Sequence, residues 1–210
     1  MLAADEIVIL QDRLNKSWHE EPVAGDSSGS SESWQKALPT DEWLRDVSRQ
    51  HRANFELWHI EDEARAPGAT DAELAEVKRR VDSTNQRRND LAEELDRALL
   101  AFLAGRGLPN CDAALNSESP GLIIDRLSIL SLKIWHTREE AERAGAGPAH
   151  AERNRERLAV LTEQRADLAR CLDSLWTDTL AGKRRFKLYR QMKMYNDPTL
   201  NPAIYGKLGQ

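Results

Sequence analysis

The sequence predicts an all-α protein built from two helical hairpins of one design. Leucine, alanine, arginine and glutamate dominate the composition, and no long stretch alternates β-branched with polar residues. Helix start and stop signals delimit four long segments, and the second pair of segments repeats the first. We therefore expect an antiparallel four-helix bundle of two duplicated hairpins, with a short N-terminal helix and a basic C-terminal segment.

Composition shifts divide the chain into four parts. Residues 1–20 are an N-terminal helix, because Ile7, Leu10, Leu14 and Trp18 fall on one helical stripe over 4–19. Residues 21–39 are rich in serine and glycine and are expected to form a flexible linker. Residues 40–181 form the bundle, and residues 182–210 form the basic C-terminal segment.

Capping and breaking residues bound the helices of the bundle. Thr40 caps a helix that runs to about Arg65, and a Thr70/Glu73 capping box starts a second helix that ends near Gly105. These two helices make repeat 1, at about 41–105. Pro120 opens a nearly apolar third helix, which we expect to be the most buried, and a fourth follows from about 149, so that repeat 2 covers about 119–181.

The two repeats align without a gap when the chain is shifted by 77 residues. Residues 58–96 then match 135–173 at 14 of 39 positions, whereas unrelated segments match at roughly one position in fifteen. The shift places Trp58 and His59 on Trp135 and His136. The duplication is the strongest signal in the sequence.

Composition and charge exclude several classes of protein. No apolar run approaches the ~18 residues of a membrane span, and only two cysteines, Cys111 and Cys171, are present. We expect a cytoplasmic protein in a reducing compartment. Residues 182–210 hold seven basic residues and one acidic residue in a chain of net charge −5. Three interpretations of this segment are open. It could dock on the body, bind phosphate or nucleic acid, or bind an acidic partner, and of these nucleic acid is the least favoured.

Polar residues gather on the inner stripe of the predicted helices, where a buried charge needs a partner. Equal distance from the hairpin loops puts Arg80 near Trp58 and His59, Arg157 near Trp135 and His136, and Arg165 near Asp125. Two explanations stay open: internal salt bridges that fix register, or a pocket for a small anion. The candidate ligand-binding residues are Trp58, His59, Asp62, Arg80, Arg88, Asp125, Trp135, His136, Glu139, Arg157 and Arg165.

A metal site is a further alternative. Glu56-x-x-His59 has the spacing of helical-bundle carboxylate proteins, and His59 and His136 each have a glutamate four residues on. Lys133 replaces Glu56 in the second repeat, however, and the nearby arginines oppose a cation. We therefore assign no metal ligand and no cofactor.

Four motifs resemble the bacterial domain-of-unknown-function family 4254, and the resemblance covers nearly the whole chain outside the serine-rich linker. They are Leu57–Arg65, Asn85–Asp90, Ser119–Leu130 and Met194–Pro202. The resemblance implies a helical fold and an association with glycosyltransferases of surface-polysaccharide pathways. It implies no activity.

The leading hypothesis is a cytosolic bacterial protein that binds a small anionic ligand, phosphorylated or a nucleotide-sugar, in surface-polysaccharide metabolism. The bundle arginines and the tail would supply positive charge, and Trp58 or Trp135 a flat wall. One alternative is a non-catalytic module that binds a protein partner through its basic tail. Another is a metal-dependent helical-bundle enzyme using His59 and His136, so that enzymatic activity is left open.

Overall fold

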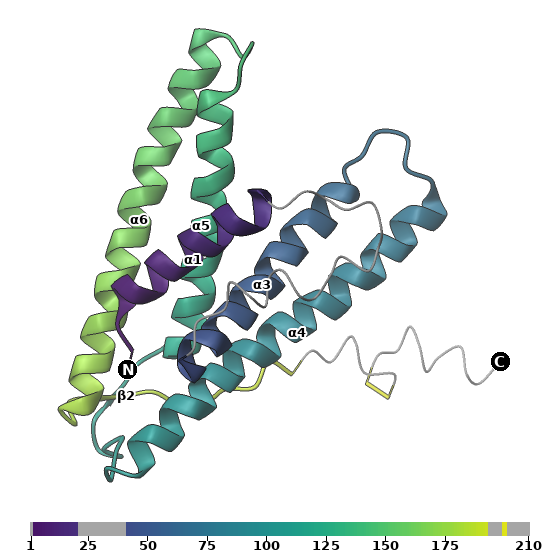
Figure 1. Cartoon of the computed structure of the whole chain (residues 1–210). Helices are drawn as coiled ribbons and strands as arrows, with labels where there is room; N and C mark the ends of the chain where they lie inside the picture. Colours follow the sequence, from purple (N-terminus) through teal and green to yellow (C-terminus); the bar gives the residue numbers. More distant parts are fainter. Residues whose placement is uncertain (1, 21–40, 193–198, 201–210) are drawn as a thin grey trace.

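The computed structural model describes residues 2–20, 41–192 and 199–200, and this part of the chain is all-helical apart from one pair of two-residue strands. The predicted all-α class is confirmed. The linker predicted at 21–39 and most of the basic segment beyond 192 lie outside the described residues. The helices are α1 (Ala4–Glu20), α3 (Glu42–Glu63), α4 (Asp71–Ala104), α5 (Pro120–Glu142) and α6 (Pro148–Leu180) (Figure 1).

Most of the capping residues predicted from the sequence lie at the observed helix starts. The Thr70/Glu73 capping box is present at the start of α4, and Pro120 lies in the first turn of α5. At α3 the cap is Asp41 rather than the predicted Thr40, because the Asp41 carboxylate accepts a hydrogen bond from the Leu44 amide at 3.0 Å. The break between α3 and α4 contains Gly68, whose φ of +88° suits glycine.

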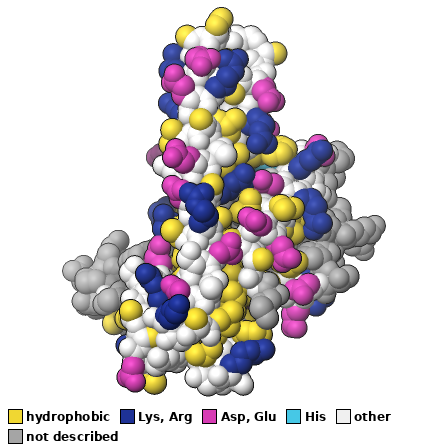
Figure 2. Space-filling model, turned by 90° about the vertical axis from the view of Figure 1, so that its left-hand side faces the viewer, with side chains coloured by type: hydrophobic (Ala, Val, Ile, Leu, Met, Phe, Trp, Pro, Cys, Tyr) yellow, Lys and Arg dark blue, Asp and Glu magenta, His cyan; other side chains and the backbone are white. Residues whose placement is uncertain are grey.

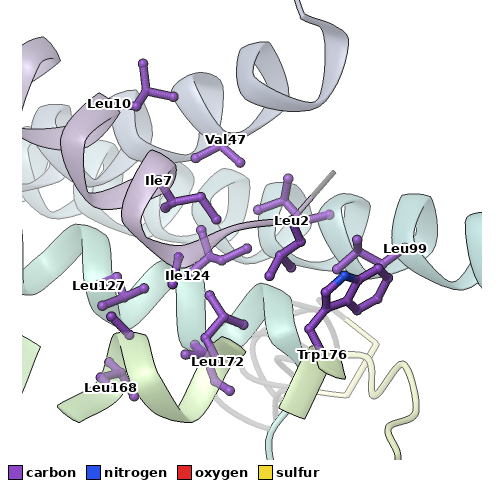
Figure 3. Close-up of a cluster of buried hydrophobic side chains, with 14 of the residues drawn as sticks. Leu2, Ile7, Leu10, Val47, Leu99, Ile124, Leu127, Leu168, Leu172 and Trp176 are labelled. Carbon is purple, nitrogen blue, oxygen red and sulfur yellow. The ribbon is translucent and has the colours of Figure 1, made fainter. Parts of the chain in front are cut away.

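Helix α5 is the centre of the fold because its sequence is apolar over most of its circumference. It contacts α1, α3, α4 and α6. In Figure 3, Ile124 and Leu127 of α5 lie among Ile7 of α1 and Leu168 and Leu172 of α6. Burial of such side chains supplies most of the free energy that holds the helices together.

The four-helix antiparallel arrangement is not confirmed. The hairpins α3–α4 and α5–α6 diverge, and α1 lies across them (Figure 1). Helix α1, which we expected outside the bundle, packs against α3, α5 and α6. Its apolar stripe, Ile7, Leu10, Leu14 and Trp18, is buried as predicted. Helical periodicity does not predict this packing, because residues 21–39 separate α1 from the bundle along the chain.

The start of the basic segment docks on the body. Strand β1 (Ala114–Leu115) pairs in parallel with β2 (Arg184–Arg185). The Arg185 Nε donates to the Ala113 carbonyl at 2.9 Å, and Phe186 is buried. This contact accords with the first of the three interpretations of the basic residues. None of the described helices is long and apolar enough to cross a membrane.

A close contact between α4 and α5 fixes the N-terminus of α5. Ser119, at the N-cap of α5, makes no side-chain hydrogen bond to the helix backbone. The Asp96 carboxylate of α4 instead accepts a hydrogen bond from the Gly121 amide at 2.7 Å. A Cβ at position 121 would lie 2.2 Å from the Ala92 carbonyl oxygen, so the contact requires glycine.

We predict that Gly121→Ala lowers the free energy of unfolding by about 3 kcal/mol, because backbone atoms must move to admit the methyl group. Urea denaturation measures this. Gly105→Ala is the matched control, since its Cβ would meet nothing closer than 3.8 Å. A change at position 121 no larger than the control would contradict the close contact.

Asp96 makes the stability of the α4–α5 contact depend on pH. Burial raises the pKa of Asp96 to about 6, against the hydrogen bonds from Ser119 and Gly121. A raised folded-state pKa stabilises the fold fully below the unfolded value of 3.8, and this contribution is lost as pH rises through about 6.

We predict that Asp96→Asn removes a fall of up to about 3 kcal/mol in the free energy of unfolding between pH 4 and pH 7. Asparagine keeps an oxygen for the Gly121 amide but does not ionise. Denaturation of both proteins across this range measures the difference in slope. Equal slopes would show that Asp96 ionises as it does in an unfolded chain.

Candidate functional site

Most of the arginines predicted to face a ligand are paired with carboxylates instead. Arg80 forms two hydrogen bonds with Glu63, at 2.5 and 3.0 Å, on the surface. Arg88 forms an ion pair with Asp125 at 3.1 Å. Arg165, which we expected near Asp125, binds Asp12 of α1 at 2.6 Å. Of the four candidate arginines, Arg80, Arg88 and Arg165 thus have their charge neutralised within the fold.

Arg157 is exposed. The hydrogen bond of its guanidinium goes to the Asn154 side chain at 3.4 Å, instead of to the Trp135–His136 pair. On the face shown in Figure 2, basic and acidic side chains are interspersed, without a large patch of one sign. The contact of Arg157 does not favour an anion site at this residue, and the mixed charge does not favour one on the face shown.

A small pocket of about 320 Å³ lies beside Trp58, with Asn54 and Arg88 in its wall. Asp62 also lines it and lies 3.6 Å from Arg65. The charged residues in the wall are two acids and two arginines, since Glu61 is present as well. Positive and negative charges balance, so that the pocket has no excess of positive charge to attract an anion.

A buried histidine joins α1, α3 and α5. His51 of α3 has no exposed surface. Its Nε2 lies 3.1 Å from the Gln11 carbonyl and 2.9 Å from the Asn15 side-chain oxygen, both in α1, and its Nδ1 lies 2.7 Å from the Ser128 hydroxyl of α5. The Gln11 carbonyl can only accept, so Nε2 carries the proton and Nδ1 accepts from Ser128.

Burial lowers the pKa of His51 to about 3, so the ring is neutral at physiological pH. A neutral ring needs one donor and one acceptor partner, and the three helices supply both. His51 thus sets the relative register of α1, α3 and α5.

Buried polar contacts extend from His51 on both sides. Towards α4, Ser128 accepts from Asn54 at 2.9 Å, and Asn54 also donates to Asp125 at 2.9 Å. Burial raises the pKa of Asp125, whereas Arg88 and the amides of Asn54 and Gln50 lower it. This set of contacts continues into α1. We call the whole of it the polar seam, and its members are Arg88, Asp125, Asn54, Gln50, Ser128, His51, Asn15, Ser131, Asp12 and Arg165.

Towards α6, the polar seam runs through α1. Asn15 donates to Ser131 at 2.8 Å, Ser131 donates to Asp12 at 2.8 Å, and Asp12 accepts from Arg165. The polar seam therefore begins at Arg88 and ends at Arg165, and every link is a hydrogen bond or an ion pair. Its two terminal ion pairs, Arg88–Asp125 and Arg165–Asp12, are of the kind that the internal salt-bridge alternative expects.

The same register brings three histidines together at one end of the α3–α5 contact. His59 and His136 each follow the His51–Ser128 pair by eight residues, and their ring centroids lie 5.9 Å apart. His19, in the last turn of α1, completes the group. Each ring offers one nitrogen, and these three nitrogens lie within 4.8 Å of one another. We call His19, His59 and His136 the histidine cluster.

Aromatic side chains hold two of these rings. The Trp58 indole stacks on His136 with centroids 4.7 Å apart, and Trp135 stacks on His19 at 4.8 Å. Four sequence-predicted residues, Trp58, His59, Trp135 and His136, are thus brought together. The tryptophans serve as walls for the histidines.

Each ring of the histidine cluster has its Nδ1 held by an oxygen. The Nδ1 of His19 lies 2.7 Å from the Asn15 carbonyl, and that of His59 lies 2.8 Å from the Phe55 carbonyl. The Nδ1 of His136 lies 2.9 Å from the carboxylate of Glu139. Since these oxygens accept, each Nδ1 carries a proton, and in a neutral ring the Nε2 then keeps a free lone pair.

Two of the free Nε2 atoms, those of His19 and His136, are buried without a hydrogen-bond partner. Burial lowers the pKa of both rings, against the Asn15 carbonyl at His19 and against Glu139 at His136. Both rings are therefore neutral at pH 7. Unpaired lone pairs in a buried place are costly unless something binds them.

Sequence reasoning missed His19. The residue lies in the last turn of the predicted N-terminal helix beside Trp18, but helical periodicity within one segment does not say which helices it meets. The only available signal was that the chain has five histidines and one of them closes an amphipathic stripe. Of the two acids predicted here, Glu139 binds His136, whereas Asp62 is exposed and paired with Arg65.

Comparison with known proteins identifies a family but not an activity. The model of the family DUF4254, described as a protein of unknown function, matches residues 44–188. This range contains α4, α5 and α6, most of α3, and two of the three clustered histidines. The chain matches no curated protein and no solved structure.

Proposed function

The chain belongs to the DUF4254 family of proteins of unknown function, and we propose that it is a metalloprotein that binds one divalent transition metal, of which zinc is the best fit, at the histidine cluster. The convergence of three ring nitrogens within 4.8 Å carries this proposal. The proposal develops the metal-site alternative stated above for His59 and His136, with His19 as a third ligand.

The donors suit zinc. Zinc binds neutral imidazole at about 2.0–2.1 Å, so that the nitrogens of a tetrahedral site lie roughly 3.3 Å apart. The three nitrogens of the histidine cluster lie within 4.8 Å of one another, so they would have to approach further to bind one zinc ion. Histidine ligands of zinc usually donate their other N–H to a carboxylate or a carbonyl, which fixes the ring orientation. Phe55, Asn15 and Glu139 supply these acceptors.

Three ligands leave one coordination position of a tetrahedral metal for water, a substrate or a further group. Among the described residues, no cysteine, aspartate or glutamate joins the histidine cluster. An open position is what a hydrolytic zinc enzyme requires. The buried Nε2 atoms and the shared ligation of three helices favour a metal that organises the fold, so we propose metal binding without assigning catalysis.

The two hairpin ligands occupy equivalent positions, since His59 and His136 lie 77 residues apart, the spacing of the duplication we propose. No comparable observation supports the anionic ligand or a module that uses the tail, because the inner arginines are largely paired with carboxylates. A role in bacterial surface-polysaccharide metabolism is a hypothesis drawn from the family resemblance alone, and a cytoplasmic location is an expectation drawn from the two cysteines.

We predict that His59→Ala and His136→Ala each weaken zinc binding by more than about 100-fold, since each removes one of three ligands. Calorimetric titration of the metal-free protein with zinc measures this, at an expected stoichiometry of one. His150→Ala is the matched control, because His150 binds Glu140 and lies outside the histidine cluster. Stoichiometric binding that survives both cluster substitutions would refute the site.

A second prediction concerns the carboxylate behind His136. Glu139→Gln replaces the acceptor of the Nδ1 proton with a weaker one and is expected to lower zinc affinity by about 10- to 100-fold, without unfolding the protein. Glu140→Gln, one residue on, is the control, because Glu140 contacts His150 and Arg143 instead. Equal affinities in the two variants would show that Glu139 does not support a ligand.

A further inference from the structure

Helix α1 is held on the rest of the protein by its own side chains. It packs against α3, α5 and α6, and its apolar stripe is buried. Polar contacts add to this: the Ala4 amide donates to Asp173 of α6 at 2.9 Å, and Asp12 binds both Ser131 and Arg165. Along the chain, α1 is joined to α3 through residues 21–41.

The histidine cluster crosses this contact. His19 is the ligand from α1, whereas His59 belongs to α3 and His136 to α5. Helix α1 lies across the two hairpins (Figure 1), and its last turn brings His19 to the other two rings. A metal at the histidine cluster therefore bonds α1 to both hairpins at once.

We propose that this metal is a latch for α1: metal binding holds the helix against α3, α5 and α6, and metal loss weakens its docking. The inference rests on the proposed function. When α1 leaves, His19 leaves with it, and a site of two ligands binds zinc far more weakly than a site of three. A ligand that binds one state preferentially shifts the equilibrium towards that state by the difference in affinity.

The linkage has a definite size. If zinc binds only the docked form, the ratio of docked to undocked protein rises by 1 + [Zn]/Kd, or about 100-fold at a free zinc concentration of 100 Kd. Undocking uncovers Ile124 and Leu127 of α5 and removes both α1 partners of the His51 Nε2. Opening is therefore unfavourable without metal and rarer with it.

Hydrogen exchange of the full chain tests the latch. We expect the amides of 7–20 in α1 to exchange up to about 100-fold more slowly with saturating zinc than with a chelator. The amides of 89–95 in α4, which packs against α3 and α5, should gain less protection and are the internal reference. His59→Gln and His136→Gln change no residue of α1. They should abolish the zinc-dependent slowing of exchange in α1, whereas His150→Gln should preserve it.

Asp12→Asn provides a second test, because it weakens the Arg165 contact of α1 without touching a ligand. Its α1 should exchange faster than wild type in chelator, and zinc should restore protection. If zinc binds through the three histidines but α1 exchanges at the same rate with and without it, the latch is wrong and the metal site stands. If zinc does not bind, both proposals fail.

Discussion

The hydrogen bond between His51 and Ser128, at 2.7 Å, fixes how α3 lies against α5. It lies where α1, α3 and α5 meet, and the other nitrogen of the same ring faces two oxygens of α1. A sliding of any of the three helices by one residue would leave a buried imidazole nitrogen unpaired. Because α3 and α5 run side by side in the same direction, the register that pairs His51 with Ser128 also brings His59 to His136 eight residues later.

The polar seam explains why this interior tolerates so many charges. A buried charge is stable only when it is paired and its remaining hydrogen bonds are satisfied. Asp125 meets this condition through Arg88, Asn54 and Gln50. At the other end, Asp12 of α1 does the same for Arg165. These arginines are part of the structural frame, which is why the expectation of a site awaiting an anion finds little support.

Much of the local structure could be predicted from the sequence. The Thr70/Glu73 capping box and the apolar run of α5 are local signals, and each is borne out by its helix. The shift of 77 residues aligns Trp58–His59 with Trp135–His136, and these residues come together in the structure. Helical periodicity assigns a residue to a face, and this was sufficient for those four.

The rest depended on which helices meet. Helical periodicity does not state what lies opposite a face, so Arg165 was placed beside Asp125 when its partner is Asp12. The segment 21–39 carries no information on distance, and the docking of α1, with His19, could not be foreseen. The histidine cluster was missed for the same reason, since its third member comes from that helix.

The protonation of the histidine rings decides whether the histidine cluster can bind a metal through its Nε2 atoms. Long-range nitrogen–proton NMR of the metal-free protein at neutral pH distinguishes the two tautomers of each ring. We expect the Nδ1–H form for His19, His59 and His136, the Nε2–H form for His51, and a zinc-induced change at the Nε2 of the first three alone. Nε2–H tautomers in the histidine cluster, or zinc-induced changes at His51 or His150 instead, would contradict it.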